Sequence, residues 1–216
     1  SSDVCSSDLG FFEKYFPDTL PLIDDLEDSF FGNPTGHMVT VKCASWSAGD
    51  EALLMGDAAH AIVPFFGQGM NCGFEDCSEF FRLWDEGLAP EAIFDEMSRI
   101  RPANADAIAD MAVENFLEMR DRVGDDQFLR EKHLEKRIQI AFPREYISRY
   151  SLVSFSRVPY TVALQAGAAQ ARFLASACRP GVDPESVDLS ALLPIIREQI
   201  SPILRAHLPH GLHQEV

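Results

Sequence analysis

The chain lacks an excess of positive charge. Its 216 residues include 18 lysines and arginines but 34 aspartates and glutamates, which gives a formal net charge of −16 at pH 7. Nucleic acids and anionic membranes attract proteins mainly through clustered basic side chains, so this balance argues against both as partners. A small anionic ligand is compatible with it, because salt screens distant charges and local groups decide such binding.

The chain also lacks cysteine pairs, a long apolar run and a secretion signal. Its five cysteines contain no Cys-x-x-Cys pair, which argues against a disulfide framework and a metal site and favours a reducing cytoplasm. The most apolar stretch, residues 158–178, is interrupted by Gln165, Gln170 and Arg172 and is too polar for a membrane span. Residues 1–9 have neither the basic start nor the apolar centre of a signal peptide. We expect a soluble, cytoplasmic protein.

Strand patterns are scarce, and helix patterns fill most of the chain. Strands are predicted only at residues 37–43, which alternate and are rich in β-branched side chains, and at the apolar run Ala52–Met55, which has the pattern of a buried strand. Residues 146–155 fit a helix and an extended segment equally well. Two strands do not form a stable sheet alone, so the chain is predicted to be part of a larger fold. Helices are predicted at residues 11–16, 20–29, 70–84, 90–101, 103–123, 125–141, 159–177 and 189–204.

One stretch, Glu51–Cys77, organises the rest of the sequence. Its predicted strand ends at Gly56-Asp57, a loop rich in glycine and proline follows, and a helix begins near Met70. Free backbone N–H groups and the positive end of the helix dipole lie at such a start and favour a negative or electron-rich ligand. The apolar side of this helix is expected to face inward; it consists of Phe74, Cys77, Phe80, Phe81 and Trp84.

This stretch carries a resemblance to a known family. Residues Gly56-Asp57-Ala58-Ala59-His60, Pro64 and Gly67-Gln68-Gly69-Met70-Asn71 closely resemble the second FAD-binding motif of the single-component aromatic hydroxylases. The longer string DAAHAIVPFFGQGMNCGFEDC is similar to the branch of that family that acts on L-kynurenine, as are residues 115–120 and 142–155. The resemblance covers about residues 11–170. It implies the α/β FAD/NAD(P)-binding fold of that family, to which this chain would contribute a mainly α-helical part with a few strands.

The resemblance implies flavin contacts whose chemistry suits the residue types. Asp57 could accept hydrogen bonds from two ribityl hydroxyls of FAD, and charge-assisted bonds of this kind are strong. Gly67 and Gly69 let the backbone approach a flat ring without a Cβ in the way. The amides of Met70 and Asn71 could donate to the pyrimidine edge of the flavin, where the helix dipole would stabilise negative charge.

The same resemblance implies a reaction. NADPH would reduce FAD, molecular oxygen would add to the flavin, and one hydroxyl would pass to the aromatic ring of L-kynurenine, a step of tryptophan catabolism toward NAD biosynthesis. Pro64, Phe65 and Phe66 would form an apolar wall that keeps water from the reacting ring. No residue is assigned an acid–base or nucleophilic role, and His60 is expected to be a packed or surface histidine rather than a catalytic one.

The resemblance also implies substrate contacts by Asn115, Glu118, Met119 and Tyr150, with Phe65 beside them. The first three are spaced i, i+3 and i+4, which places them on one face of a helix. An amide and a carboxylate on that face suit the amino-acid end of kynurenine, and Tyr150 could hydrogen-bond its carboxylate. The alternative is that these are ordinary polar and core positions of a long helix.

Some features of the family are missing. No GxGxxG turn is present to hold the FAD pyrophosphate, and no acidic residue follows such a turn to hold the ribose. We therefore expect the C-terminal portion of a hydroxylase, with little FAD binding and no turnover by these 216 residues alone. The absence of the membrane anchor found in animal members favours a soluble, bacterial-like form.

This interpretation predicts four segments. Residues 1–10 would be a disordered, unrelated leader, residues 11–50 the end of the substrate-domain region, residues 51–123 the C-terminal part of the FAD-binding domain, and residues 124–216 a C-terminal helical domain. Two alternatives are a flavin hydroxylase with another aromatic substrate, and a non-catalytic helical module whose exposed apolar face promotes association.

Overall fold

The computed structural model describes residues 8–208 and divides the chain into two compact units, residues 1–38 and 39–216. The first unit contains α1 (Asp8–Tyr15), the 3-10 turn η1 (Leu20–Leu22) and α2 (Leu26–Gly32). Residues 1–7 of the predicted disordered leader, residues 1–10, lie outside the described residues. The prediction of disorder is wrong for residues 8–10, which begin α1. The predicted helix 20–29 is also wrong in its bounds, because the α-helix begins only at Leu26 and continues to Gly32.

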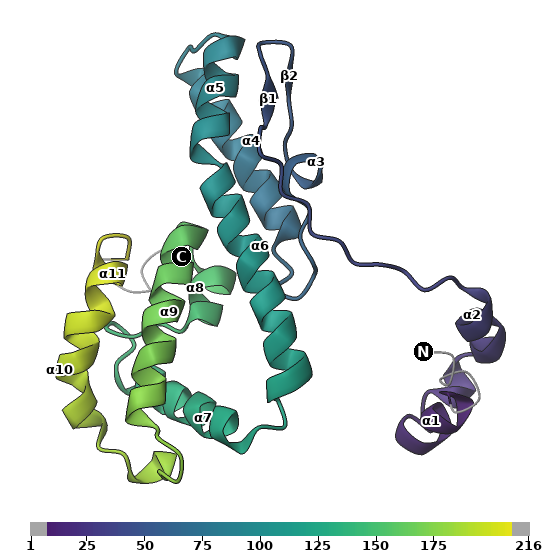
Figure 1. Ribbon diagram of the computed structural model, residues 1–216, viewed down its shortest axis with the longest axis vertical. Coiled ribbons are helices and arrows are strands. Elements are labelled where there is room, and N and C mark those ends of the chain that lie inside the picture. Colours follow the sequence, from purple (N-terminus) through teal and green to yellow (C-terminus); the bar gives the residue numbers. More distant parts are fainter. Residues whose placement is uncertain (1–7, 209–216) are drawn as a thin grey trace. The chain divides into compact units, whose positions relative to one another are not determined.

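The second unit is a set of helices that follows one short hairpin (Figure 1). Helices α4 and α5 lie side by side next to the hairpin, α6 continues from the end of α5, and α9 packs against α6, α7, α8 and α11. In order, the elements are β1 (Ser47–Ala48), β2 (Ala52–Leu53), α3 (Asp57–His60), α4 (Gly69–Asp85), α5 (Pro90–Ile100), α6 (Pro102–Leu117), the π-turn η2 (Glu118–Arg122), α7 (Asp126–Ala141), α8 (Arg149–Phe155), α9 (Tyr160–Ala177), η3 (Pro184–Ser186), α10 (Leu189–Gln199) and α11 (Ser201–Arg205).

The sheet within the described residues is smaller than predicted. Strands β1 and β2 pair antiparallel, with Ser47 opposite Leu53. The predicted strand 52–55 therefore spans two residues, and the prediction that it is buried is wrong, because Leu54 is 39% exposed. The predicted strand 37–43 is also wrong: the segment forms no ladder, although the Cys43 amide donates to the carbonyl of Ala59 in α3 and the Val41 amide to the carbonyl of Ala61 just after it.

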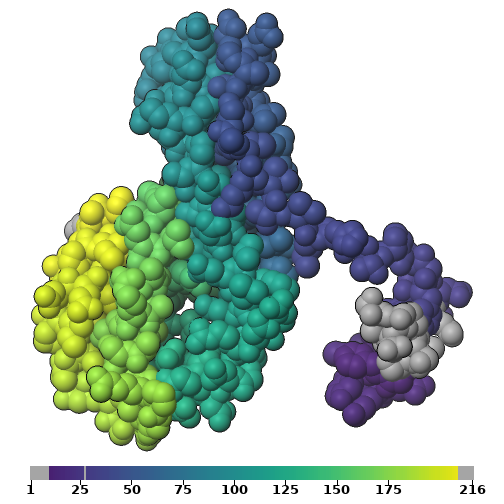
Figure 2. Space-filling model, viewed as in Figure 1, coloured from purple at the N-terminus to yellow at the C-terminus, as the bar shows by residue number. Residues whose placement is uncertain are grey.

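The core of the second unit lies between α6 and α9. Helix α6 begins directly at Pro102, which ends the hydrogen-bond pattern of α5, and it buries the predicted face that includes Ile108 and Met111. Helix α9 buries small residues such as Ala163 and Ala166, and the absence of long side chains there lets the two helices approach closely. The atoms of α8–α11, green to yellow in Figure 2, form one continuous surface over this core. None of the helices in residues 8–208 is both long and apolar enough to cross a membrane.

Helix α4 shows the largest difference from expectation. Most of its predicted inward side is exposed: Phe74 and Phe81 are each 62% accessible, Trp84 is 54% accessible and Cys77 is exposed, whereas Phe80 is partly buried against the cluster of Leu83, Ile93 and Met97. The buried side of α4 instead consists of Cys72, Asp76 and Leu83. The apolar spacing identified a real apolar stripe, but it did not reveal that nothing in the described residues covers it.

Candidate functional site

The turn between β2 and α3 holds a free carboxylate. Gly56 has φ 56° and ψ −141°, a conformation that only glycine adopts readily. It lies directly against α4, since a Cβ built on Gly73 would be 3.6 Å from the Gly56 Cα. Asp57 follows as the first residue of α3, and its exposed side chain makes no hydrogen bond within residues 8–208. A ligand at this turn meets an unpaired negative charge.

The start of α4 is open. Its N-cap residue, Gln68, makes no side-chain capping bond, and the first helical N–H with an acceptor is that of Cys72, which donates to the Gln68 carbonyl at 2.9 Å. The N–H groups of the first turn, Gly69 to Asn71, have no acceptor inside a helix. Gly73, which touches the turn of Gly56, lies about 4.5 Å along the helix axis from Met70. The Asp57 carboxylate therefore follows a backbone turn that contacts α4 about one helical turn after the free amides.

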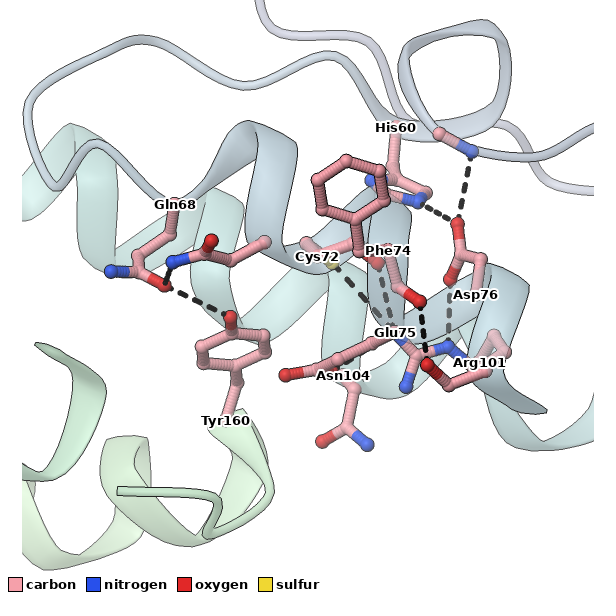
Figure 3. A network of polar contacts seen from close by, with 12 residues as sticks. His60, Gln68, Cys72, Phe74, Glu75, Asp76, Arg101, Asn104 and Tyr160 are labelled. Carbon is pink, nitrogen blue, oxygen red and sulfur yellow. Dashed lines mark hydrogen bonds and ion pairs between the residues drawn. The ribbon is translucent and has the colours of Figure 1, made fainter. Parts of the chain in front are cut away.

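The Gln68 side chain does not cap α4 but accepts hydrogen bonds from two other side chains. Its side-chain oxygen accepts from the side-chain Nδ2 of Asn71 at 2.9 Å and from the Tyr160 hydroxyl at 3.2 Å (Figure 3). Burial raises the pKa of Tyr160, which keeps the phenol protonated as a donor. These contacts join the start of α4 to α9. Sequence reasoning missed Tyr160, because 92 residues separate it from Gln68.

The predicted apolar wall contacts the predicted substrate face. The Asn115 amide donates to the Phe65 carbonyl at 2.7 Å, and the Phe65 ring lies 4.5 Å from that of Phe116. The Met119 sulfur is 3.8 Å from the Asn115 amide, as expected for residues on one helix face. The structure thus brings Phe65, Asn115 and Met119 together across 50 residues of sequence.

Tyr150 contacts the predicted apolar wall from α8, and Glu118 follows directly after α6. The Tyr150 ring stacks on Phe66 at 6.0 Å between centroids and is 57% exposed, so its hydroxyl is accessible. Glu118 begins the short π-helical segment η2, a distortion of the α-helix that often occurs at functional sites. Its carboxylate accepts from Arg149 at 3.1 Å, and Arg149 also pairs with Glu114. The sequence assigned Glu118 to the substrate without its partner Arg149, because 31 residues separate them.

Gly167 makes room for this ion pair. A Cβ built on Gly167 would be 2.4 Å from Cδ and 3.2 Å from Cβ of Arg149, so the whole base of that side chain would have to move. We expect Gly167→Ala to separate Arg149 from Glu118 and to lower the free energy of unfolding of the chain by about 1–3 kcal/mol, with the fold retained. Urea denaturation and a circular dichroism spectrum check this. Gly124→Ala is the control, because a Cβ at Gly124 meets no atom within 4 Å, and equal losses of stability for both variants would contradict the mechanism.

A buried charged cluster lies beneath the turn of Gly56 (Figure 3). Asp76, which is fully buried, accepts from the Gly56 amide at 2.9 Å, from His60 Nε2 at 2.6 Å and from Arg101 Nε at 2.7 Å. His60 is 1% exposed and stacks on Trp46, which confirms a packed histidine. Burial by itself would lower the pKa of His60, but the hydrogen bond to Asp76 overrides it and the pKa rises to about 10. His60 is therefore charged at neutral pH.

This pKa predicts a pH dependence of stability. A histidine whose pKa rises from 6.5 to about 10 on folding stabilises fully below pH 6.5, and this contribution is lost as the pH rises toward 10. We expect the free energy of unfolding to fall across that window by at most about 1.4 kcal/mol per pH unit for this group. Urea unfolding of the wild type and of His60→Gln at several pH values measures it. Equal slopes for the two proteins would contradict a charged His60.

A cavity of about 760 Å³ lies on one side of these elements. Its lining includes Gln68, Asn71, Arg101 and Tyr160, but not Asp57, Pro64 or Gly67. Those three residues are exposed, as is Met70. The predicted flavin contacts thus share an edge with the cavity and otherwise lie on an open surface.

Comparisons with known proteins show what the chain is similar to. The family model described as "FAD binding domain" matches residues 22–112, which include the turn of Gly56 and the start of α4. A kynurenine 3-monooxygenase of Myxococcus xanthus is 53% identical over 91% of this chain, and one of Dictyostelium discoideum is 48% identical over 76% of it. One of Legionella pneumophila is 38% identical over 90%. The chain spans only 42%, 38% and 44% of these three relatives.

Proposed function

Because the chain belongs to the FAD-dependent hydroxylase family that includes the kynurenine 3-monooxygenases, we propose that it forms the C-terminal part of an enzyme that converts L-kynurenine to 3-hydroxykynurenine. FAD, NADPH and molecular oxygen would be its cofactors and co-substrate, in tryptophan catabolism toward NAD biosynthesis. The observation that carries the proposal is the free carboxylate of Asp57 beside the uncapped start of α4, within the residues that match the FAD-binding domain.

The described residues fit one flank of FAD, which supplies the redox chemistry when it is bound. Asp57 would accept hydrogen bonds from ribityl hydroxyls, because its carboxylate is exposed and has no other partner in residues 8–208. The amides of Met70 and Asn71 would donate to the pyrimidine edge, where the end of the α4 dipole favours negative charge. Gly67, with φ 66°, and the exposed Pro64 would shape the loop along the ring.

The substrate side would be formed by Phe65, Asn115, Met119 and Tyr150. The Asn115 amide group is oriented by its bond to the Phe65 carbonyl, which leaves the side-chain oxygen to accept from the ammonium group of an amino acid. The exposed Tyr150 hydroxyl would donate to the substrate carboxylate. Glu118 would contribute through Arg149, since the two form an ion pair. Phe65 and Met119 supply apolar surface for an aromatic ring.

The segments predicted from the sequence are part of the proposal. Residues 11–50 would end the substrate-domain region, residues 51–123 would belong to the FAD-binding domain, and residues 124–216 would form the C-terminal helical domain. The chain has no GxGxxG turn, so polypeptide beyond these residues would bind the FAD pyrophosphate and NADPH. A cytoplasmic location goes with this proposal.

The test compares the 216-residue chain with the full-length protein. We expect the full-length protein to purify with flavin and to oxidise NADPH faster when kynurenine is added, and the chain alone to bind little flavin. Stimulation by another aromatic acid but not by kynurenine would favour the alternative hydroxylase. Stoichiometric flavin on the chain alone would contradict the proposed need for further polypeptide.

One observation favours association as a second property of the isolated chain. Phe74, Phe81 and Trp84 form an exposed apolar stripe on α4, and such surfaces cause self-association. A non-catalytic helical module would show this association in the full-length protein too. Size-exclusion chromatography of both forms distinguishes the two functions, because a former interface would be covered in the full-length enzyme.

A further inference from the structure

The buried cluster beneath the turn of Gly56 contains a carboxylate that makes no contact with any proposed ligand position. Asp76 projects from the buried side of α4, two helical turns after its start. Its Oδ2 accepts from Gly56 N and His60 Nε2, and its Oδ1 accepts from Arg101 Nε. One side chain therefore joins the β2–α3 turn, the end of α3 and the junction of α5 with α6 (Figure 3).

Arg101 determines which way this carboxylate points. It is the residue between α5 and α6, it is 4% exposed, and its guanidinium also reaches the Cys72 carbonyl at 3.4 Å and Glu75 at 3.2 Å. Because the guanidinium is held at three points, the Oδ1 of Asp76 has one favourable position, and Oδ2 is left facing the Gly56 amide. The planar guanidinium is better suited to such a fixed arrangement than a lysine would be.

The Gly56 amide links the Asp76 carboxylate to the β2–α3 turn. Gly56 holds a glycine-specific conformation, which persists only where surrounding contacts determine it. Its backbone touches Gly73 of α4, and the bond to Asp76 is the polar contact that ties it to that helix among the described residues. Asp57 comes next in the chain, so the orientation of the Gly56 peptide decides where the Asp57 carboxylate points.

We infer that Asp76 is a positioning residue of the flavin site, which fixes the carboxylate of Asp57 relative to the open amide end of α4. The inference rests on the proposed function for the identity of the ligand. A buried ionic cluster is seldom the most stabilising choice, since well-packed apolar residues often serve as well. Its three bonds to separate segments instead define one geometry for the turn. Asp76 acts through Asp57 and touches no cofactor itself.

The first experiment needs no flavin. Hydrogen exchange of residues 53–60 is measured in the 216-residue chain as wild type, Asp76→Asn and Glu79→Gln. Glu79 lies on the same helix and, among the described residues, pairs only with the surface residue Arg82, so its variant is a matched control. We expect Asp76→Asn to speed exchange of this segment about tenfold or more and Glu79→Gln to leave it unchanged. Unchanged exchange in Asp76→Asn would overturn the inference.

The second experiment is a double-mutant cycle in the full-length enzyme. FAD affinity is measured by flavin fluorescence for Asp57→Asn, Asp76→Asn and the double variant. We expect each single change to weaken binding about tenfold or more, and the double variant to be little weaker than Asp57→Asn alone, because Asp76 acts through Asp57. Fully additive losses would indicate a merely structural role and overturn the inference.

If Asp76→Asn does not fold, Arg101→Lys takes its place in both experiments, because it keeps the charge but not the fork that orients the carboxylate. The same outcomes then apply. The two experiments also separate the two proposals. If the wild-type enzyme binds no flavin, the proposed function fails and with it the flavin role of Asp76, whereas the exchange result still decides whether Asp76 anchors the turn.

Discussion

Replacing Asp57 with alanine is expected to weaken FAD binding by the full-length enzyme by about two to four orders of magnitude. The carboxylate is exposed, has no partner among the described residues and follows a turn fixed against α4. Each hydrogen bond to a charged group contributes about 1.5–3 kcal/mol, so the loss of two bonds corresponds to roughly 3–6 kcal/mol. Apoprotein titrated with FAD and followed by flavin fluorescence measures the change.

The matched control for this prediction is Asp85→Ala. Asp85 is the last residue of α4, it is exposed, and it lies about 22 Å along the helix from Met70. The two variants lose the same charge, so any general electrostatic effect is common to both. A loss of less than about threefold for Asp57→Ala, or equal losses for the two variants, would mean that Asp57 does not contact the cofactor.

Replacing Asp76 with alanine is expected to lower the free energy of unfolding of the chain by about 3–5 kcal/mol at neutral pH. The change leaves the buried Arg101 guanidinium without the anion that it contacts, and it removes the hydrogen bond that keeps the buried His60 protonated. The hydrogen bonds of Asp76 hold its own pKa below the usual range against the effect of burial, so the carboxylate is charged. Urea denaturation followed by circular dichroism measures the loss.

Glu79→Ala provides the control for this second prediction. Glu79 also comes from α4 and also pairs with an arginine, but both partners are partly exposed. Exposed ion pairs contribute about 0–1 kcal/mol, so this variant is expected to unfold almost like the wild type. A loss of less than about 1 kcal/mol for Asp76→Ala would show that the cluster is relaxed or hydrated rather than closed.

Local patterns accounted for the helices and for the identity of the motif. Pro102 and the apolar spacing of α6 predicted a helix start and a buried face that the structure confirms. The string from Gly56 to Asn71 predicted a turn, a loop and a helix start in the right order. These features depend on residues within a few positions of one another, so the sequence carries them directly. The strand at 37–43 failed because a strand requires a neighbour, which the local pattern does not reveal.

The sequence by itself determined the helical content, the turn of Gly56, the open start of α4 and the similarity of the chain to an FAD-binding domain. Only the tertiary structure decided that Asp76 and Arg101 lie beneath that turn, that Arg149 forms an ion pair with Glu118 and that Phe74 is exposed. The physical reason is separation along the chain. Helix propensity acts between neighbours, whereas burial and ion pairing depend on which distant segments the fold brings together.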